Sequence, residues 1–371
     1  MAVYVERFGI KQFRGIGGLE LEDLNHVNII AGDNNSGKTS VLEAMLLLRN
    51  PKNFNNILRI ARMRDNGSPS STLPTFDNFI NVFPRNSDPL EVSIDGVCMS
   101  KSVMVCIKGF QKTILLEPEE LYGHGTVVRK MRSSGSLGET EASAFTGELK
   151  YDVAGDRGSS PIIEFHSHSR TTGREIEKDN YMNIIYLSPT DHIRSNKFSK
   201  IVRDDLYKEI CVNVLRLFDS EILDILYLKN ETTDRPIEYV KHATLGNMPL
   251  STYGDGIKKV LSLANGIAQA SNGILMLDEL ETSIHAKYYD DIFRFVVKAC
   301  KQFQVQLFVT THSIEAIDAL LATQDYGQHE SDNISVITFR KDEKTNKTLS
   351  RTLPGEQVFK NRGNFSFEVR I

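Results

Sequence analysis

Apolar residues divide the chain into two regions of different character. From about residue 250, short runs of consecutive apolar residues alternate with segments in which apolar residues recur every three or four positions. Such runs are typical of buried strands, and such segments are typical of amphipathic helices. We therefore predict strands at 274–277, 305–310 and 334–339, and helices at 256–268, 286–301 and 314–321. Strands that alternate with helices indicate a largely parallel sheet, whose ligands bind at the carboxyl ends of its strands.

The first 120 residues carry mainly strand signals. Three apolar stretches separated by glycines predict strands at 3–10, 19–21 and 26–31. A second group is predicted to form an antiparallel meander, with strands at 90–94, 102–107 and 113–116. Between the two groups, residues 50–78 are rich in Asn, Pro, Gly and Ser, which predicts an irregular surface segment.

The middle of the chain has weaker signals. Residues 123–160 are rich in Gly, Ser and charge, so we predict a mobile segment with one hairpin around 149–153. A buried strand is predicted at 182–189 and a helix at 199–218. A hairpin is predicted to join 227–228 to 237–240. No heptad pattern persists, so no long coiled-coil arm is expected.

Composition limits the function classes only broadly. The 371 residues are 40% hydrophobic and 25% charged, as in an ordinary globular protein, and the formal net charge is −4. This charge provides no general electrostatic attraction for nucleic acid, although it allows a local basic patch. The four cysteines have no metal-ligand spacing. Neither a signal-peptide core nor a run of ~20 apolar residues is present, which predicts a cytoplasmic protein without membrane association.

The strongest chemical signal follows the strand predicted at 26–31. Gly32, Gly37, Lys38 and Thr39 fit the phosphate-binding pattern G-x-x-x-x-G-K-[ST], between a predicted strand and a predicted helix. Backbone N–H groups at the start of such a helix surround phosphates, the lysine adds a positive charge, and the Thr39 hydroxyl can ligate Mg²⁺. The residues expected to bind ATP are Gly32, Asn34, Asn35, Ser36, Gly37, Lys38, Thr39 and Ser40.

Arg14 is a further candidate for ATP binding. It lies in the loop between the first two predicted strands. Its side chain could reach the bound nucleotide, or it could be a solvated loop arginine, and the sequence leaves both interpretations open.

Two later strands end in residues that would complete such a site. The strand predicted at 274–277 ends at Asp278 and Glu279, as in a Walker B motif, where the first acid holds Mg²⁺ and the second polarises the attacking water. The next strand ends near His312, whose imidazole could bind the γ-phosphate and orient the water. We therefore predict Glu279, His312 and Lys38 as catalytic residues, and Thr39 and Asp278 as magnesium ligands.

A second glycine-bounded helix start precedes these strands. Residues Gly254, Asp255, Gly256 and Lys258 lie at the beginning of the helix predicted at 256–268. Glycine near a helix N-terminus is common, so this motif is weak alone. In an ATPase that already has one phosphate-binding helix start, a second can cap the γ-phosphate of the opposite subunit.

Together these motifs resemble the ABC-type ATPases of the SMC/RecF group, and within it the OLD (overcoming lysogenization defect) ATPases. The resemblance implies the α/β fold of an ABC/SMC-type ATPase head with a mixed sheet, an antiparallel β lobe and a short helical insertion. It also implies that Gly254–Gly256 act across a head-to-head dimer with ATP between the subunits, and that residues 281–285 form the D-loop at that interface. Gly254 stands where many relatives have a signature serine. Asp191 is a weak candidate for the Q-loop position.

The resemblance further implies a single head assembled from both ends of the chain. We expect an N-terminal lobe at 1–120, a flexible insertion at 121–180, a helical and hairpin lobe at 181–245, and a lobe at 246–371 with the signature, Walker B, D-loop and histidine. Many OLD proteins continue into a Toprim nuclease domain with clustered acids. No such cluster follows His312 here, so we expect an ATPase without a fused nuclease.

These features favour an ATP-hydrolysing switch that forms a homodimer or a larger even-numbered assembly. The switch is expected to control a separately encoded effector, such as a nuclease, in bacterial anti-phage defence or abortive infection. A RecF-like DNA-repair ATPase is the alternative, with DNA as a partner bound through residues such as Arg194, Lys197, Lys200 and Arg203. The nucleotide-binding subunit of a transporter is a third hypothesis, which the unusual signature disfavours.

Overall fold

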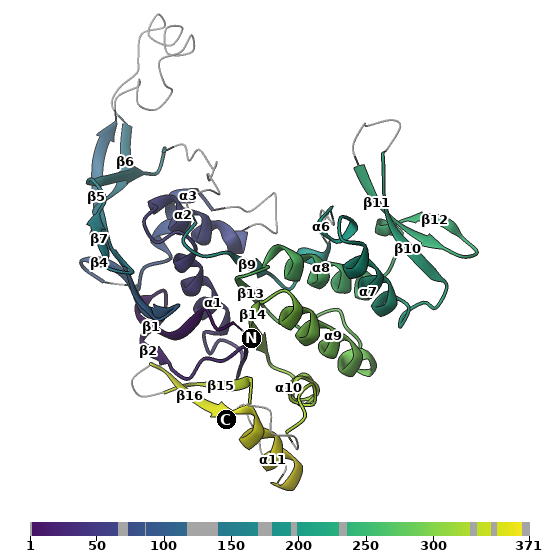
Figure 1. The fold of residues 1–371 in the computed structure, drawn as a ribbon. Helices are drawn as coiled ribbons and strands as arrows, with labels where there is room; N and C mark the ends of the chain where they lie inside the picture. The colour runs from purple at the N-terminus through teal and green to yellow at the C-terminus, as the bar shows by residue number, and fades with distance from the viewer. Residues whose placement is uncertain are drawn as a thin grey trace, which may run out of the picture. The chain divides into compact units, whose positions relative to one another are not determined.

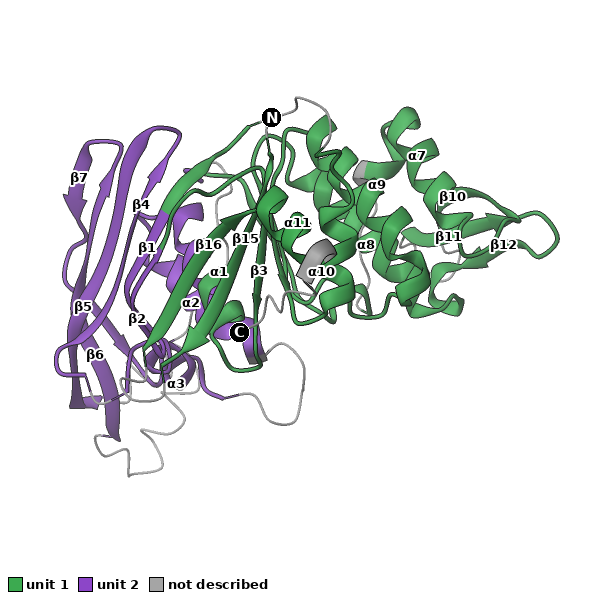
Figure 2. Cartoon of the chain, turned by 90° about the horizontal axis from the view of Figure 1, so that it is seen from below, with its two compact units in different colours: residues 1–7, 21–42, 182–371 green, residues 8–20, 43–181 purple. Residues whose placement is uncertain are grey.

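The chain folds into two compact units, each assembled from separate stretches of sequence. The computed structural model describes residues 2–65, 73–85, 87–116, 140–169, 180–193, 199–229, 236–326, 332–342 and 347–365. Unit 1 comprises residues 1–7, 21–42 and 182–371, and unit 2 comprises residues 8–20 and 43–181 (Figure 2). The phosphate-binding loop therefore belongs to the unit that contains 182–371, whereas the β meander belongs to the other. The lobe predicted at 1–120 instead contains both the phosphate-binding loop and the β meander.

A mixed sheet forms the centre of unit 1. Within the described residues it has six strands in the order β16-β15-β3-β14-β13-β9 (Figure 1). The strands are β3 (Val27–Gly32), β9 (Ile184–Leu187), β13 (Ile274–Leu277), β14 (Gln306–Thr311), β15 (Ile334–Lys341) and β16 (Thr348–Pro354). All neighbouring pairs are parallel except β15 and β16. The carboxyl ends of β3, β13 and β14 consequently meet at one edge, as the sequence predicts.

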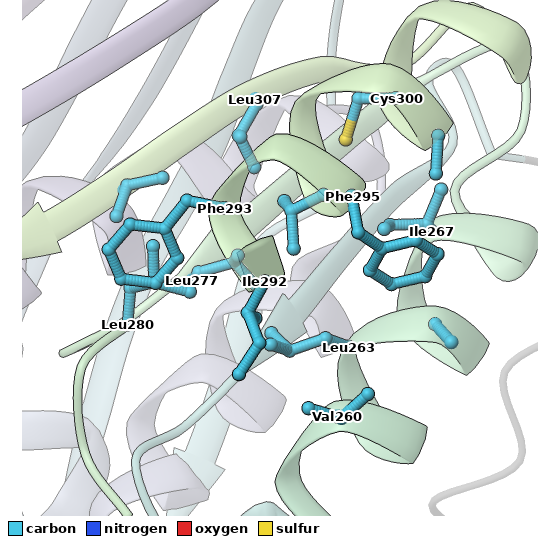
Figure 3. Packing of buried hydrophobic residues seen from close by; sticks show 14 of the residues in the cluster. Val260, Leu263, Ile267, Leu277, Leu280, Ile292, Phe293, Phe295, Cys300 and Leu307 are labelled. Carbon is cyan, nitrogen blue, oxygen red and sulfur yellow. The ribbon is translucent and has the colours of Figure 1, made fainter. Parts of the chain in front are cut away.

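Helices cover the sheet of unit 1 and supply its core. They are α6 (Ser199–Val202), α7 (Asp205–Leu215), α8 (Asp255–Gln269), α9 (Tyr289–Gln302), α10 (Ile314–Leu321) and α11 (Gly355–Phe365). Apolar side chains of α8 and α9 pack together with Leu277 of β13 and Leu307 of β14 (Figure 3). The bounds of α10 are those predicted from the sequence, whereas α11 was not predicted.

A small antiparallel sheet also belongs to unit 1. Strands β10 (Ile222–Lys229), β11 (Pro236–His242) and β12 (Gly246–Pro249) pair in this order. This confirms the hairpin predicted between 227–228 and 237–240. Buried Ile225 and Val240 lie opposite each other, so one face of this sheet contributes to the core.

Most of a seven-stranded sheet, counted over the described residues, lies in unit 2. Its strands are β1 (Val5–Phe13), β2 (Ile16–Leu21), β4 (Leu90–Cys98), β5 (Lys101–Leu116), β6 (Thr140–Val153), β7 (Asp156–Ser159) and β8 (Ile163–His166). The order is β2-β1-β4-β5-β6-β7, with β8 also paired to β6. The predicted antiparallel pairing of the strand at 90–94 with the strand at 102–107 is confirmed by β4 and β5, and β6 continues the antiparallel order beyond them.

One prediction for unit 2 is wrong. The strands predicted at 102–107 and 113–116 are one strand, β5, which continues through Gly109 because that glycine lies opposite Gly147 and both accommodate the Phe145 ring. The segment 121–180, predicted to be a flexible insertion, contains the long strand β6, which pairs with β5 over its whole length, and β6 and β7 form a hairpin next to the one predicted around 149–153. Residues 117–139 and 170–179 lie outside the described part of the chain.

The segment 50–78 is not irregular as predicted. It contains α2 (Phe54–Arg62) and α3 (Thr75–Ile80), which provide the short helical insertion. The Asn53 side chain caps α2 by accepting a hydrogen bond from the Asn55 N–H. Phe79 of α3 is fully buried among other phenylalanines. Among the described residues, no helix is both long and apolar enough to span a membrane.

Candidate functional site

The phosphate-binding loop joins β3 to helix α1 (Lys38–Met45) at the carboxyl end of the central strand. All six residues of β3 are buried, and β14 and β15 pair with it on either side. Gly32 has φ +151° and Gly37 has φ +98°, and a Cβ on Gly32 would lie 2.8 Å from the Phe339 carbonyl oxygen. The loop conformation therefore requires glycine at both ends of the pattern.

The side chains of this loop fit a triphosphate. Lys38 is 9% exposed, and its Nζ donates to the carbonyl oxygens of Gly32 at 2.7 Å and Asp33 at 2.8 Å. Burial lowers the pKa of Lys38, while the nearby carboxylates of Asp278 and Glu279 oppose that shift. The Ser36 hydroxyl is buried without a hydrogen-bond partner. A phosphate chain would satisfy this hydroxyl, the ammonium group and the N–H groups at the start of α1.

Asp278 lies directly after β13 at the same edge of the sheet. Its carboxylate is almost fully buried and accepts hydrogen bonds from three hydroxyls: Thr39 at 2.9 Å, Tyr186 at 3.0 Å and Thr310 at 2.6 Å. The structure thus brings together the two residues predicted to hold magnesium, Thr39 and Asp278. Their oxygens fit Mg²⁺, which usually takes few protein ligands and completes its shell with water and substrate phosphates. Among the described residues, no group of three or more His, Cys, Asp or Glu could hold a metal.

Glu279 follows in a constrained conformation. Its φ of +48° lies in the left-handed region, which non-glycine residues rarely adopt and which occurs preferentially at functional sites. The N–H of Glu279 donates to Thr310 Oγ1 at 2.9 Å, and its Oε2 accepts from the Thr282 hydroxyl at 3.2 Å. Thr310 therefore fixes the backbone of Glu279, and Thr282 holds its side chain.

His312 follows the end of β14 and is fixed by one carboxylate. Glu281 Oε1 accepts the backbone N–H of His312 at 3.1 Å and lies 3.2 Å from its Nδ1. This contact assigns the ring proton to Nδ1, so Nε2 can donate to a phosphate only when the imidazole is doubly protonated. Half of the His312 side chain is exposed, whereas Glu281 is buried.

The predicted trans-acting residues lie at the start of α8. Gly254 is the N-cap residue, and a Cβ there would meet no atom within 4 Å. Asp255 is the first residue of the helix, and its Oδ1 lies 3.4 Å from the Lys258 ammonium group. Gly256 is more confined, because a Cβ would lie 3.0 Å from the Phe218 ring. The helix start is exposed and therefore accessible to a second molecule. Binding of a second subunit at this helix start stays a prediction.

Arg14 belongs to unit 2, and its guanidinium group has protein partners. Its Nε donates to Glu43 Oε2 at 2.8 Å, and Nη1 lies 3.4 Å from the Asn81 carbonyl oxygen. Burial lowers the pKa of Arg14, and Glu43 opposes this shift. Contact between Arg14 and a nucleotide stays a prediction.

The Q-loop candidate, Asp191, accepts the N–H of Ser188 at 2.7 Å and so stabilises its own turn. From the same region, Tyr186 is the residue whose side chain reaches Asp278. Of the proposed DNA-binding residues, the side chains of Arg194, Lys197 and Lys200 lie outside the described part of the chain.

Sequence reasoning missed three residues that complete the site: Tyr186, Glu281 as the partner of His312, and Thr310. A signal existed for Thr310, because it is a polar residue at the end of a buried strand. Thr310 is fully buried, and its hydroxyl joins the carboxylate of Asp278 to the N–H of Glu279.

The variant Thr310→Val should lower kcat for ATP hydrolysis by about 10–100-fold, the usual range for residues that orient ligands of a metal site. Valine has nearly the same shape but leaves the N–H of Glu279 without its partner and removes the shortest hydrogen bond to Asp278, which costs about 1–3 kcal/mol. Phosphate-release kinetics and urea unfolding test this. Thr310→Ser, which keeps the hydroxyl, is the control, and equal activity of the valine and serine variants would contradict the assignment.

Comparisons with known proteins agree with this architecture. A family model described as "AAA domain, putative AbiEii toxin, Type IV TA system" matches residues 148–318. A protein of Helicobacter pylori named ATP/GTP phosphatase is 21% identical, and the alignment covers 97% of this chain and 99% of that protein. The DNA replication and repair protein RecF of Pseudoalteromonas translucida is 50% identical over 50 residues, 14% of each chain.

The fold is similar to that of SMC head domains. The crystal structure of an SMC head bound to the C-winged helix domain of ScpA superposes with a TM-score of 0.50 at 15% identity and covers 96% of this chain and 100% of that chain. The α/β fold, with a mixed central sheet and two further sheets among the described residues, is thus that of an ABC/SMC-type ATPase head, as the sequence predicts.

Proposed function

We propose that the chain is an ATPase that acts as a dimeric switch and controls a separately encoded effector, with a nuclease as the expected type, in bacterial anti-phage defence or abortive infection. The observation that carries the ATPase assignment is the hydrogen bond between Thr39 and Asp278, which joins the phosphate-binding loop to the acid after β13. The similarity to a protein named ATP/GTP phosphatase, over nearly the whole of both chains, supports the same activity.

Each residue of the site has a separate role in ATP hydrolysis. Lys38, Ser36 and the N–H groups at the start of α1 bind the phosphates, and Thr39 and Asp278 hold Mg²⁺, which neutralises charge on the phosphates when bound. Glu279 orients the attacking water and accepts its proton. His312, fixed by Glu281, binds the γ-phosphate. The chain hydrolyses ATP to ADP and phosphate through these groups.

Dimerisation would complete the site. The exposed start of α8 at Gly254–Gly256 offers N–H groups and a helix dipole, with which one subunit can cap the γ-phosphate bound by its partner. ATP would then close the dimer and hydrolysis would open it. This gives the enzyme two assembly states that an effector can distinguish.

The proposed biological role rests on two resemblances. The family model that matches 148–318 carries the name of a toxin of a toxin–antitoxin system, and the motifs resemble those of OLD ATPases. Both favour a defence role. The short similarity to RecF favours a second candidate, an ATPase that binds DNA directly.

Three measurements on the purified protein test the proposal. We expect phosphate release from ATP, a doubled molar mass with a non-hydrolysable ATP analogue, and binding of the product of an adjacent gene in only one nucleotide state. Absence of both hydrolysis and nucleotide-dependent assembly would refute the switch. Salt-sensitive DNA binding without a protein partner would favour the repair function instead.

A further inference from the structure

The turn after β13 holds both groups that are proposed to act at the γ-phosphate. Glu281 Oε1 accepts the backbone N–H of His312 at 3.1 Å, and the hydroxyl of Thr282 donates to Glu279 Oε2 at 3.2 Å. The N–H of Thr282 also donates to the carbonyl oxygen of Glu279 at 3.1 Å. A displacement of residues 279–283 would therefore move the Glu279 carboxylate and the His312 imidazole together.

Ser283 ends this turn in a conformation that serine rarely adopts. Its φ is +68°, in the left-handed region that glycine adopts freely and other residues adopt at a cost. Glycine would thus satisfy the backbone at this position. Where the surrounding structure maintains such a conformation, the side chain that occupies it is a candidate for a functional role.

The hydroxyl of Ser283 makes a hydrogen bond with a buried histidine. It lies 3.0 Å from Nε2 of His192, which is 4% exposed. His192 belongs to the short 3-10 helix Asp191–Ile193 after β9, and the Asp191 carboxylate fixes the start of this segment by accepting the N–H of Ser188 at 2.7 Å. Helix α8 packs against the same segment. The hydrogen bond consequently joins Ser283 to a fixed part of unit 1.

The backbone of Ser283 also lies close to the start of α8. A Cβ on Gly256 would lie 3.5 Å from the Ser283 carbonyl oxygen. Ser283 therefore joins three parts of unit 1. These are the turn that holds Glu279 and His312, the segment after β9, and the helix start that is predicted to cap a partner's nucleotide.

We propose that His192 and Ser283 are positioning residues of the ATP site, whose hydrogen bond fixes the turn 279–283 and thereby places Glu279 and His312. Neither residue contacts ATP in this role. The inference rests on the proposed ATPase function. It also accounts for a serine where glycine would suit the backbone, because only the serine has a hydroxyl for His192.

Steady-state kinetics test the catalytic part. Ser283→Ala and His192→Leu should each lower kcat for ATP hydrolysis by about 2–10-fold, the rate equivalent of one net hydrogen bond, while KM for ATP changes by less than about twofold. His192→Gln should recover most of kcat, because its amide offers both a donor and an acceptor near the place of Nε2. A rise in KM that matches the fall in kcat, or no recovery by glutamine, would overturn the positioning role.

The matched control is Ser87→Ala in unit 2. It removes a serine hydroxyl that donates to the Pro84 carbonyl oxygen at 2.9 Å, so the chemical change is the same at a position outside the site. This variant should hydrolyse ATP at the wild-type rate. A fall in its kcat equal to that of Ser283→Ala would contradict a specific role for Ser283.

The variant Ser283→Gly separates positioning from stability. Glycine removes the hydroxyl but is unstrained at φ +68°, whereas alanine keeps the strain. Ser283→Gly should therefore unfold at a higher urea concentration than Ser283→Ala, yet its kcat should be as low. Recovery of kcat in the glycine variant would show that stability limits turnover, and would overturn the proposal.

Histidine NMR tests the positioning without ATP. In protein with isotopically labelled histidine, Ser283→Ala should shift the imidazole signals of His192 and His312, which the variants His192→Leu and His312→Asn identify. Ser87→Ala should leave both signals in place. An unchanged His312 signal in Ser283→Ala would overturn the proposal. A wild-type protein that shows the expected shifts but does not hydrolyse ATP would refute only the proposed function.

Discussion

Replacement of Glu279 by glutamine is expected to lower kcat for ATP hydrolysis by about 10²–10⁴-fold, the usual contribution of a general base. Glutamine has nearly the same shape and can still accept the hydrogen bond from the Thr282 hydroxyl, but it cannot take a proton from water. ATP binding should persist, so the variant should accumulate as an ATP-bound dimer. Single-turnover phosphate release and light scattering with ATP measure the two effects.

The matched control for this variant is Glu209→Gln on the exposed face of α7, which should hydrolyse ATP at the wild-type rate. An unchanged rate of ATP hydrolysis in Glu279→Gln would show that another group is the general base. A slow variant that stays monomeric with ATP would leave the catalytic assignment intact and contradict the dimeric switch.

The second large effect is expected from Lys38→Met, which should raise the Kd for ATP by about 10–150-fold. This range corresponds to the loss of a charged hydrogen bond worth about 1.5–3 kcal/mol. Titration with a fluorescent ATP analogue measures it. Because burial lowers the pKa of Lys38, folding disfavours its charged form, and the methionine variant should unfold at the same or a higher urea concentration.

This combination separates a binding defect from misfolding. A variant that binds ATP weakly but unfolds like the wild type supports the role of Lys38 in phosphate binding. The control Lys298→Met, on the exposed face of α9, should change neither property. A Kd for Lys38→Met within a factor of about two of the wild type, well below the expected loss, would contradict the role.

The central sheet of unit 1 could be predicted because local and long-range signals agree there. The runs at β3, β13 and β14 are buried on both faces, so they appear as continuous apolar segments that end in polar residues. The carboxyl ends of neighbouring parallel strands lie together. The order of the strands and the motifs that follow them therefore suffice to predict that Lys38, Asp278 and His312 lie at one edge of the sheet.

The rest depends on contacts that local sequence does not contain. Helix α2 was missed because its asparagines were interpreted as loop residues, although Asn53 caps the helix and Asn56 is buried, with its amide donating to main-chain carbonyls. Gly109 was interpreted as a break because its partner, Gly147, is distant in sequence. Similarly, no local pattern distinguishes the buried Lys259 from the half-buried Lys258.

The pairing of β3 also has a consequence for biosynthesis. Val27 pairs with Leu307 and with Ile334, so the strand before the phosphate-binding loop meets its first neighbour 280 residues later (307 − 27). At about 5–20 residues per second, a ribosome needs roughly 15–60 s to make that stretch. Until then the loop has no sheet to support it. A nascent chain therefore gains the ability to bind nucleotide only late in translation, and ribosome-bound truncations that end before β14 should not retain ATP.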